Sequence, residues 1–129
     1  MFTGSMVALV TPMMNGELDE RSFRRVVGTH SKSGTSAVVP AGCTGEAGTL
    51  TRAERLRMIE ICLEELGDDT AVIPGTGSNS TSETVRLTRE AAEAGAHGAL
   101  IITPYYNKPT PEGQYRHYRT VASEVDIPI

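Results

Sequence analysis

The chain has 129 residues, of which 39% are apolar and 22% are charged, and its formal net charge is −4. This length predicts one domain, and the acidic balance argues against a general nucleic-acid-binding protein. No apolar run reaches the roughly 18 residues that a membrane span needs, and residues 1–5 lack the pattern of a signal peptide. We therefore expect a cytoplasmic globular protein that binds neither nucleic acid nor membranes.

Four short apolar runs, at residues 6–10, 37–40, 71–74 and 99–102, are the predicted strands. Each run is unbroken rather than alternating, which is typical of strands buried on both faces of a parallel sheet. They recur about every thirty residues, and segments with helical spacing lie between them. This regular alternation of strand and helix predicts an α/β fold.

The helical segments have recognisable starts at Asp19, Thr51, Ser80 and the Thr110-Pro111 pair. Glu54 and Glu83 each lie three residues after a cap, which predicts capping boxes for the second and third helices. Gly34, Gly67 and Gly95 follow the predicted helix ends. The apolar stripes that we expect to be buried are Phe23, Val26, Val27 and His30; Leu56, Ile59, Leu63 and Leu66; Val85, Leu87 and Ala91; and Tyr115, Tyr118, Ala122 and Val125.

Strict alternation leaves two architectures, an open doubly wound sheet or a (βα)₈ barrel. No strand is followed by G-x-G-x-x-G at the start of a helix, whereas polar and glycine-rich segments follow all four predicted strands. Active sites lie at that edge of a barrel, but a barrel needs about 250 residues. The chain has about half of that length.

The segment Gly42-Cys43-Thr44-Gly45-Glu46 follows the second predicted strand. Its two glycines let the backbone approach a ligand closely, and its amides and the Thr44 hydroxyl could hold a carboxylate. The alternative is a tight turn in which Thr44 and Glu46 only satisfy loose backbone groups.

Two adjacent tyrosines, Tyr105 and Tyr106, follow the fourth predicted strand. Neighbouring side chains of an extended segment alternate, so one phenol could face a pocket and carry a proton while the other faces a partner subunit. The alternative is an aromatic plug over the rim of the sheet. The only lysines, Lys32 and Lys108, lie in polar surroundings and are expected to be solvated, unlike a Schiff-base lysine.

The remaining candidate groups are weak. Cys43 and Cys62 lack C-x-x-C spacing, and the three histidines are never four residues apart, so we expect no metal site, no disulfide framework and no cofactor. Cys62 lies next to an apolar stripe and is expected to be buried. Cys43 is the thiol in the candidate loop, but no basic residue before Arg52 would activate it as a nucleophile.

Several segments together resemble the dihydrodipicolinate synthase family of pyruvate-dependent lyases and aldolases, which is related to N-acetylneuraminate lyase. The resemblance covers essentially the whole chain. It rests on Phe2-Thr-Gly-Ser with Ala8-Leu-Val-Thr-Pro12, on Gly42-Cys-Thr-Gly-Glu46, on Gly75-Thr-Gly-Ser-Asn79 and on Thr103-Pro-Tyr-Tyr-Asn-Lys-Pro109. The Gly-x-Thr-Gly-Glu motif serves the wider family, and the Pro-Tyr-Tyr-Asn run favours the synthase.

The resemblance implies the N-terminal (βα)₄ half of a TIM (βα)₈ barrel, with residues 1–129 ending at the start of a fifth strand. It also implies a lyase of lysine (diaminopimelate) biosynthesis. In that reaction a lysine forms a Schiff base with pyruvate, and the enamine attacks aspartate semialdehyde. The expected assembly is a homo-oligomer, a dimer or a tetramer.

The resemblance also implies roles for individual residues. Thr44 and Cys43, with the neighbouring backbone, match the site that binds the pyruvate carboxylate, and Tyr106 matches a tyrosine that completes a proton relay in a neighbouring subunit. An allosteric lysine site is implied at Asn79, Glu83 and Tyr105, where Arg55 stands in place of a histidine expected in feedback-sensitive members.

Two departures from the family pattern change the expectations. Cys43 replaces a relay threonine, and because a thiol is a weak hydrogen-bonding group we expect slower proton transfer. The Schiff-base lysine, a second relay tyrosine and a substrate-binding arginine are not among these 129 residues, so we expect the chain alone to be inactive. The alternatives are a sugar-acid aldolase or sialic acid lyase, and a non-catalytic half-barrel that self-associates or modulates a full-length homologue.

Overall fold

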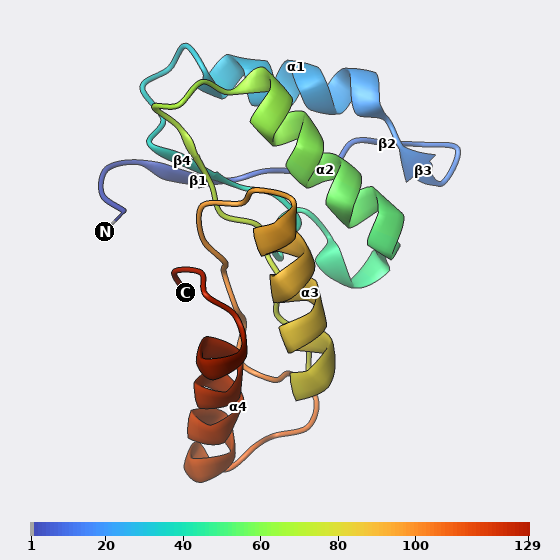
Figure 1. Cartoon of the computed structure of the whole chain (residues 1–129). Helices are drawn as coiled ribbons and strands as arrows, with labels where there is room; N and C mark the ends of the chain where they lie inside the picture. The colour runs from blue at the N-terminus through green and yellow to red at the C-terminus, as the bar shows by residue number, and fades with distance from the viewer. Residues whose placement is uncertain (1) are drawn as a thin grey trace.

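Parallel strands and helices alternate along the computed structural model, which describes residues 2–129 (Figure 1). The three strands of the main sheet are β1 (Met6–Ala8), β4 (Ala37–Val39) and β5 (Ala71–Val72). The helices are α1 (Glu20–His30), α2 (Arg52–Glu65), α3 (Thr81–Glu93) and α4 (Pro111–Glu124). Helices α1 and α2 lie side by side, as do α3 and α4.

The sheet has the order β1-β4-β5, and both strand pairs are parallel, with Met6 opposite Ala37 and Ala37 opposite Ala71. Three of the four predicted strands are therefore confirmed. The fourth apolar run continues the sheet only through a single parallel bridge between Gly75 and Leu100. The backbone amide of Leu100 also donates to the Pro74 carbonyl at 2.9 Å, so the run lies in the place of a fourth strand.

A short antiparallel hairpin, β2 (Met13–Met14) with β3 (Glu17–Leu18), was not expected from the apolar pattern. Its turn is formed by Asn15 and Gly16, both with positive φ (55° and 86°). Asn-Gly is a strong signal for a two-residue hairpin turn because both positions favour left-handed backbone. The flanking strands are only two residues long, too short for periodicity to detect.

The predicted helix starts are confirmed. Asp19 accepts from the Ser22 amide, and Thr51 forms a complete capping box with Glu54. The box of α3 is only half formed, because Ser80 accepts from the Glu83 amide while the Glu83 carboxylate binds Arg86 instead. Thr110 caps α4, with Pro111 as the first helical residue.

The buried faces of two helices differ from the predicted stripes. Helix α2 buries Met58, Ile59, Ile61 and Cys62, whereas Leu56, Leu63 and Leu66 are only half-buried. This helix is apolar around much of its circumference, so spacing alone does not select the core face. Helix α4 buries His117 and Val121, with Val125 just beyond its end, while Tyr115 and Ala122 are exposed.

The largest core lies between the sheet and helices α1, α2 and α3. It contains Leu9, Phe23, Val27, Val38, Ala41, Leu50, Met58, Ile59, Ile61, Cys62, Val72 and Ala91. A separate core of Ala99, Ile101 and Val121 joins the fourth apolar run to α4. The expectation that all four runs are buried on both faces is wrong, since Met6, Val10, Leu100 and Ile102 are exposed by 42% to 52%. Helices cover one side of these segments and leave the other open.

Among residues 2–129, no helix is both long and apolar enough to cross a membrane.

Candidate functional site

The loops that follow the strands surround a cavity of about 760 Å³ at the carboxyl edge of the sheet. The lining comes from the segment after β4, the start of α2, the segment after β5 and the fourth apolar run. Its residues are Ala41, Gly42, Cys43, Glu46, Ala47, Gly48, Thr49, Arg55, Gly75, Gly77, Leu100, Ile101, Ile102 and Tyr105. Three stretches that are far apart in sequence, residues 41–55, 75–77 and 100–105, therefore meet around one space, as expected where parallel strands end.

The loop of residues 42–46 is a compact turn between two residues in left-handed backbone. Ala41 enters it with φ 53°, and Glu46 leaves it with φ 55°. The Gly42 carbonyl accepts from the amides of Gly45 (3.1 Å) and Ala47 (3.2 Å), and the Cys43 carbonyl accepts from Glu46 (3.1 Å). A non-glycine residue in this backbone region costs of order 1–3 kcal/mol, and such strain clusters at ligand sites.

Two consecutive amides of this loop, those of Cys43 and Thr44, donate no hydrogen bond to any acceptor within residues 2–129. The side chains of both residues are exposed. Adjacent free amides with a hydroxyl beside them can bind an anion, because they present N–H and O–H donors to one oxygen group. The loop therefore has the donors that a small carboxylate needs.

The segment after β5 packs against its neighbours more closely than any side chain allows. A Cβ on Gly75 would lie 2.2 Å from the Ala41 carbonyl oxygen, and one on Gly77 would lie 2.5 Å from the Ile102 amide nitrogen. These glycines bring the backbone of three successive loops together. Their role is close approach, since neither has a positive φ.

The adjacent tyrosines lie in different surroundings. Tyr105 lines the cavity, whereas Tyr106 is 93% exposed, with φ 66°. The Asn107 side-chain amide donates to the Asn79 carbonyl at 2.6 Å, which ties this loop to the segment after β5. Thr103 and Tyr118 share a hydrogen bond of 3.0 Å between their hydroxyl groups, which fixes the start of the loop to α4.

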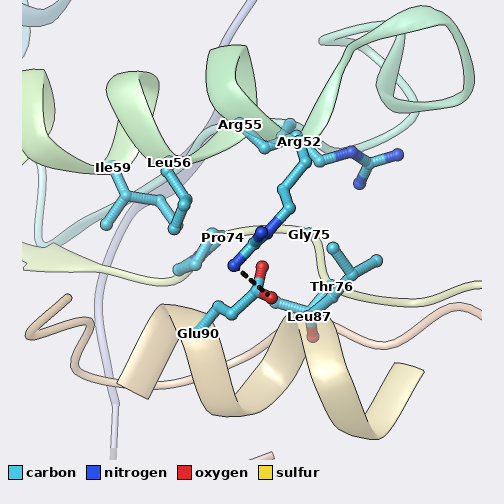
Figure 2. Close-up of a pocket in the computed structure, with 10 residues that line it drawn as sticks. Arg52, Arg55, Leu56, Ile59, Pro74, Gly75, Thr76, Leu87 and Glu90 are labelled. Atoms are coloured by element: carbon cyan, nitrogen blue, oxygen red, sulfur yellow. Dashed lines mark ion pairs between the residues drawn. The ribbon is translucent and has the colours of Figure 1, made fainter. Parts of the chain in front are cut away.

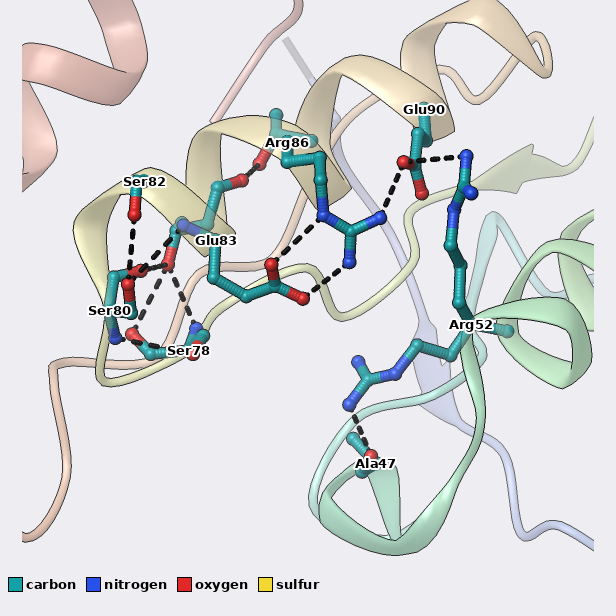
Figure 3. A network of polar contacts seen from close by, with 11 residues as sticks. Ala47, Arg52, Ser78, Ser80, Ser82, Glu83, Arg86 and Glu90 are labelled. Carbon is teal, nitrogen blue, oxygen red and sulfur yellow. Dashed lines mark hydrogen bonds and ion pairs between the residues drawn. The ribbon is translucent and has the colours of Figure 1, made fainter.

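An arginine–glutamate network joins α2 to α3. Arg52 reaches across to Glu90 at 2.9 Å, beside a small cavity of about 10 Å³ (Figure 2). Glu90 also accepts from Arg86 at 2.7 Å, and Arg86 binds both carboxylate oxygens of Glu83 (Figure 3). Hydrogen bonding to Arg86 lowers the pKa of Glu83. The Glu83 carboxylate is thus already neutralised by an arginine of its own helix.

Arg55 lines both cavities and donates to the Ala47 carbonyl. Burial lowers the pKa of its guanidinium, although its charge persists at every physiological pH. Its Nη1 atom is buried and has no hydrogen-bond partner among residues 2–129. Arg55 therefore places a positive charge where the family resemblance expects a histidine.

The other nucleophiles and titratable groups contribute little to this edge. Lys32 and Lys108 are exposed, so neither has the apolar surroundings of a Schiff-base lysine. Burial raises the pKa of the Cys62 thiol to about 12, which leaves Cys43 as the accessible thiol. In the described part of the chain no three His, Cys, Asp or Glu side chains gather closely enough to hold a metal ion.

The structure brings two of the six predicted site residues, Cys43 and Tyr105, to one cavity. Thr44 lies in the same loop as Cys43, while Tyr106, Asn79 and Glu83 do not line the cavity. The sequence analysis gave no role to Thr11, whose hydroxyl donates to the Gly45 carbonyl at 2.7 Å. Its position directly after a predicted strand was a usable signal.

Comparison with known proteins identifies close relatives. A model of the dihydrodipicolinate synthetase family matches residues 1–129. The 4-hydroxy-tetrahydrodipicolinate synthase of Syntrophobacter fumaroxidans is 53% identical over 129 residues, which is 100% of this chain and 44% of that protein. Two solved structures are also similar. Dihydrodipicolinate synthase from Aquifex aeolicus has a TM-score of 0.95 and 48% identity over 99% of this chain and 44% of its own.

The second structure is the chloride-inhibited dihydrodipicolinate synthase from Acinetobacter baumannii, which was solved complexed with pyruvate. Its TM-score is 0.96 and its identity 43%, over 99% of this chain and 44% of its own. The chain thus spans less than half the length of the relatives that it matches. Its parallel strands and alternating helices correspond to the N-terminal half of a TIM barrel, which confirms the predicted fold class.

Proposed function

The chain belongs to the dihydrodipicolinate synthetase family, and we propose that it supplies the pyruvate-carboxylate site of a 4-hydroxy-tetrahydrodipicolinate synthase. The observation that carries the proposal is the loop of residues 42–46, where the free amides of Cys43 and Thr44 adjoin the Thr44 hydroxyl at the edge of the cavity. In this role the three donors bind the carboxylate and orient the keto carbon of pyruvate.

The proposed reaction is the condensation of pyruvate with aspartate semialdehyde. A lysine forms a Schiff base with the keto group, loss of a methyl proton gives the enamine, and the enamine carbon attacks the aldehyde. Such a lysine needs an apolar pocket or a neighbouring cation, and Lys32 and Lys108 are exposed. We propose that residues 1–129 form half of a barrel domain and that the other half supplies the lysine.

Proton transfer in this proposal involves Cys43 and Tyr106. Tyr106 is almost fully exposed and does not line the cavity of its own chain, which suits a phenol that enters the site of a neighbouring subunit. A homo-oligomer is therefore part of the proposal. We also propose the cytoplasm as the compartment of the protein, because free thiols such as those of Cys43 and Cys62 stay reduced there.

We place a regulatory lysine site at Asn79, Glu83 and Tyr105. Tyr105 lines the cavity, and Asn79 is bonded to the tyrosine-bearing loop through Asn107. The ammonium group of lysine would have to compete with Arg86 for Glu83. We therefore expect feedback by lysine to be weak, and Arg86→Gln to strengthen it.

A chimera tests the proposed function. Residues 1–129 replace the 44% of the Syntrophobacter fumaroxidans synthase that they match, and condensation of pyruvate with aspartate semialdehyde is measured. We expect the chimera to be active, and Thr44→Ala to raise the KM for pyruvate. An inactive chimera that folds and assembles like the parent would contradict the proposal.

The same chimera tests the role of Cys43. A hydroxyl is a better hydrogen-bonding group than a thiol, so Cys43→Thr should raise kcat. An unchanged kcat would remove Cys43 from the proton relay. For the chain alone, borohydride reduction with pyruvate should leave no adduct on Lys32 or Lys108, and an adduct on either would show that the site is already complete in these residues.

A further inference from the structure

We propose that Thr11 is the positioning residue of the carboxylate site. Its hydroxyl clamps the loop of residues 42–46 to the end of β1 and so keeps the amides of Cys43 and Thr44 in the geometry that binds a carboxylate. The inference rests on the proposed function of that loop.

The clamp joins two segments that are 34 residues apart. The Thr11 hydroxyl donates to the Gly45 carbonyl at 2.7 Å, and its side chain is only 6% exposed. Just before it, the Leu9 amide donates to the Val39 carbonyl at 3.0 Å, the last rung that binds β1 to β4. Thr11 thus adds a hydrogen bond between the same two segments just beyond the last backbone hydrogen bond of the sheet. This bond holds the loop after β4 in place.

Gly45 shows how tightly the loop is held against this point. A Cβ at that position would lie 2.9 Å from the Leu9 carbonyl oxygen, 3.1 Å from the Ala41 amide nitrogen and 3.2 Å from the Thr11 hydroxyl. The peptide whose carbonyl Thr11 binds is therefore enclosed by the segment after β1 on one side and by the start of its own loop on the other. A shift of Gly45 would move Thr44, its neighbour in the chain.

Loss of the hydroxyl has a defined consequence. It leaves the buried Gly45 carbonyl without this donor, which favours a rearranged loop in which the carbonyl reaches water. The binding amides would then lose their fixed arrangement, and ligand affinity would fall even though every binding group is still present. Thr11 need not touch the carboxylate to have this effect.

The chain offers a matched control at the opposite edge of the sheet. The Thr70 hydroxyl donates to the Thr35 carbonyl at 3.1 Å, across 35 residues, and Thr70 is 7% exposed. It has the same residue type, burial and bond type as Thr11, but it joins the segments that precede β4 and β5. Thr11→Val and Thr70→Val should therefore cost similar stability, and only the first should disturb the carboxylate loop.

Two measurements on the full chain test the proposal. Hydrogen exchange at the bonded amides of Gly45, Glu46 and Ala47 should become about tenfold faster in Thr11→Val, the effect of one lost buried hydrogen bond, and change less than about twofold in Thr70→Val. Alkylation of Cys43 by iodoacetamide should be slowed by pyruvate, and half-protection should need about ten times more pyruvate in Thr11→Val than in wild type. Thr70→Val should match wild type.

Thr11→Ser and Thr11→Ala repeat the comparison with a smaller side chain, so the result does not depend on Thr11→Val folding. Thr11→Ser should keep the exchange rate and the pyruvate protection near the wild-type values. Thr11→Ala should exchange faster and need more pyruvate for half-protection. The proposal would be overturned if Thr11→Ser and Thr11→Ala had equal exchange rates and equal pyruvate protection. It would also be overturned if Thr70→Val altered both quantities as much as Thr11→Val does. Wild-type chain without pyruvate protection would instead contradict the proposed function, while the exchange rates would still decide whether Thr11 positions the loop.

Discussion

The two edges of the sheet differ in the residues that occupy their left-handed backbone positions. At the amino edge, the left-handed positions before the strands are glycines, namely Gly4, Gly34 and Gly95, with φ of 90°, 68° and 97°. In the loops that follow β4 and the fourth apolar run, at the carboxyl edge, they are Ala41, Glu46, Tyr106 and Lys108, with φ between 48° and 66°. Glycine adopts this conformation without strain, and the other residues do not. Strain is therefore concentrated at the edge that holds the cavity.

The two edges also differ in how their polar groups are hydrogen-bonded. At the amino edge, the Val72 amide donates to His97 Nδ1 at 3.0 Å, and Thr70 satisfies the Thr35 carbonyl. At the carboxyl edge, the amides of Cys43 and Thr44 remain free. The bonds at the amino edge join segments of the sheet to one another, whereas the two adjacent, exposed amides at the carboxyl edge are available to a ligand. This is the division expected of a barrel, in which the carboxyl edge carries function and the amino edge carries stability.

The largest expected effect contrasts glycines from the two edges. Gly75→Ala places a Cβ 2.2 Å from a backbone oxygen, so the loops must separate, and we expect a loss of about 3 kcal/mol. Gly34→Ala meets nothing within 4 Å and suffers only from its positive φ, at a cost of about 1 kcal/mol. Urea unfolding of both variants measures the difference. Equal losses would show that the backbone contact at Gly75 is no harder to disturb than a positive φ is to impose.

A smaller effect should come from releasing strain at the carboxyl edge. Glu46 has φ 55° and no side-chain cap hydrogen bond, so Glu46→Gly should stabilise the chain by about 0.5 kcal/mol. Glu46→Ala is the control, because it removes the same side chain but keeps the strain, and it should leave the free energy of unfolding nearly unchanged. The glycine variant should also bind pyruvate less tightly. If both variants lower stability equally, the left-handed backbone at Glu46 is not strained.

The smallest effect concerns pH and the helices that begin at the carboxyl edge. His117 of α4 is 3% exposed and shares a 2.9 Å hydrogen bond with Thr81 at the start of α3, and burial lowers its pKa. The unfolded chain therefore binds a proton more readily than the folded one. Stability should fall as the pH drops below about 6.5, the ordinary histidine value, and this contribution should be constant above it.

Urea midpoints between pH 7.5 and pH 5 measure this dependence. His117→Asn should flatten the curve in that range, because it removes the group that must stay neutral. The carboxylates with lowered pKa values lose their stabilising contribution only at lower pH, below about their ordinary values; they are Asp19, Glu20, Glu54, Glu64 and Glu83. An unaltered slope in His117→Asn would show that His117 is protonated without cost in the folded chain.

Local signals explain which parts of the fold could be predicted. A capping hydrogen bond joins residues that are within four positions of each other in the sequence. The helix starts at Asp19, Thr51, Ser80 and Thr110 were therefore identifiable from the sequence. The core face of α2 was not, because the helix is apolar around most of its surface and only tertiary packing selects Met58, Ile61 and Cys62 over Leu63. His117 was missed in the same way, since a buried histidine interrupts the apolar stripe of α4.

The candidate site was predictable as a set of loops but not as an arrangement. The composition of residues 42–46 and the paired tyrosines marked segments that contribute to the cavity lining, because glycines and polar groups after strands are local features. Thr11 and Gly75 act through partners 34 residues away, on Gly45 and Ala41 respectively. Such roles become visible only when the loops are placed together in space.

The most direct test of the central claim is an NMR titration of the ¹⁵N-labelled chain with pyruvate. If the carboxyl edge is the ligand edge, the amide signals of Cys43 and Thr44 should shift with one saturable binding curve. Signals at the amino edge, such as those of Thr70 and His97, should stay in place. No saturable shift at Cys43 and Thr44, or larger shifts at the amino edge, would contradict the account.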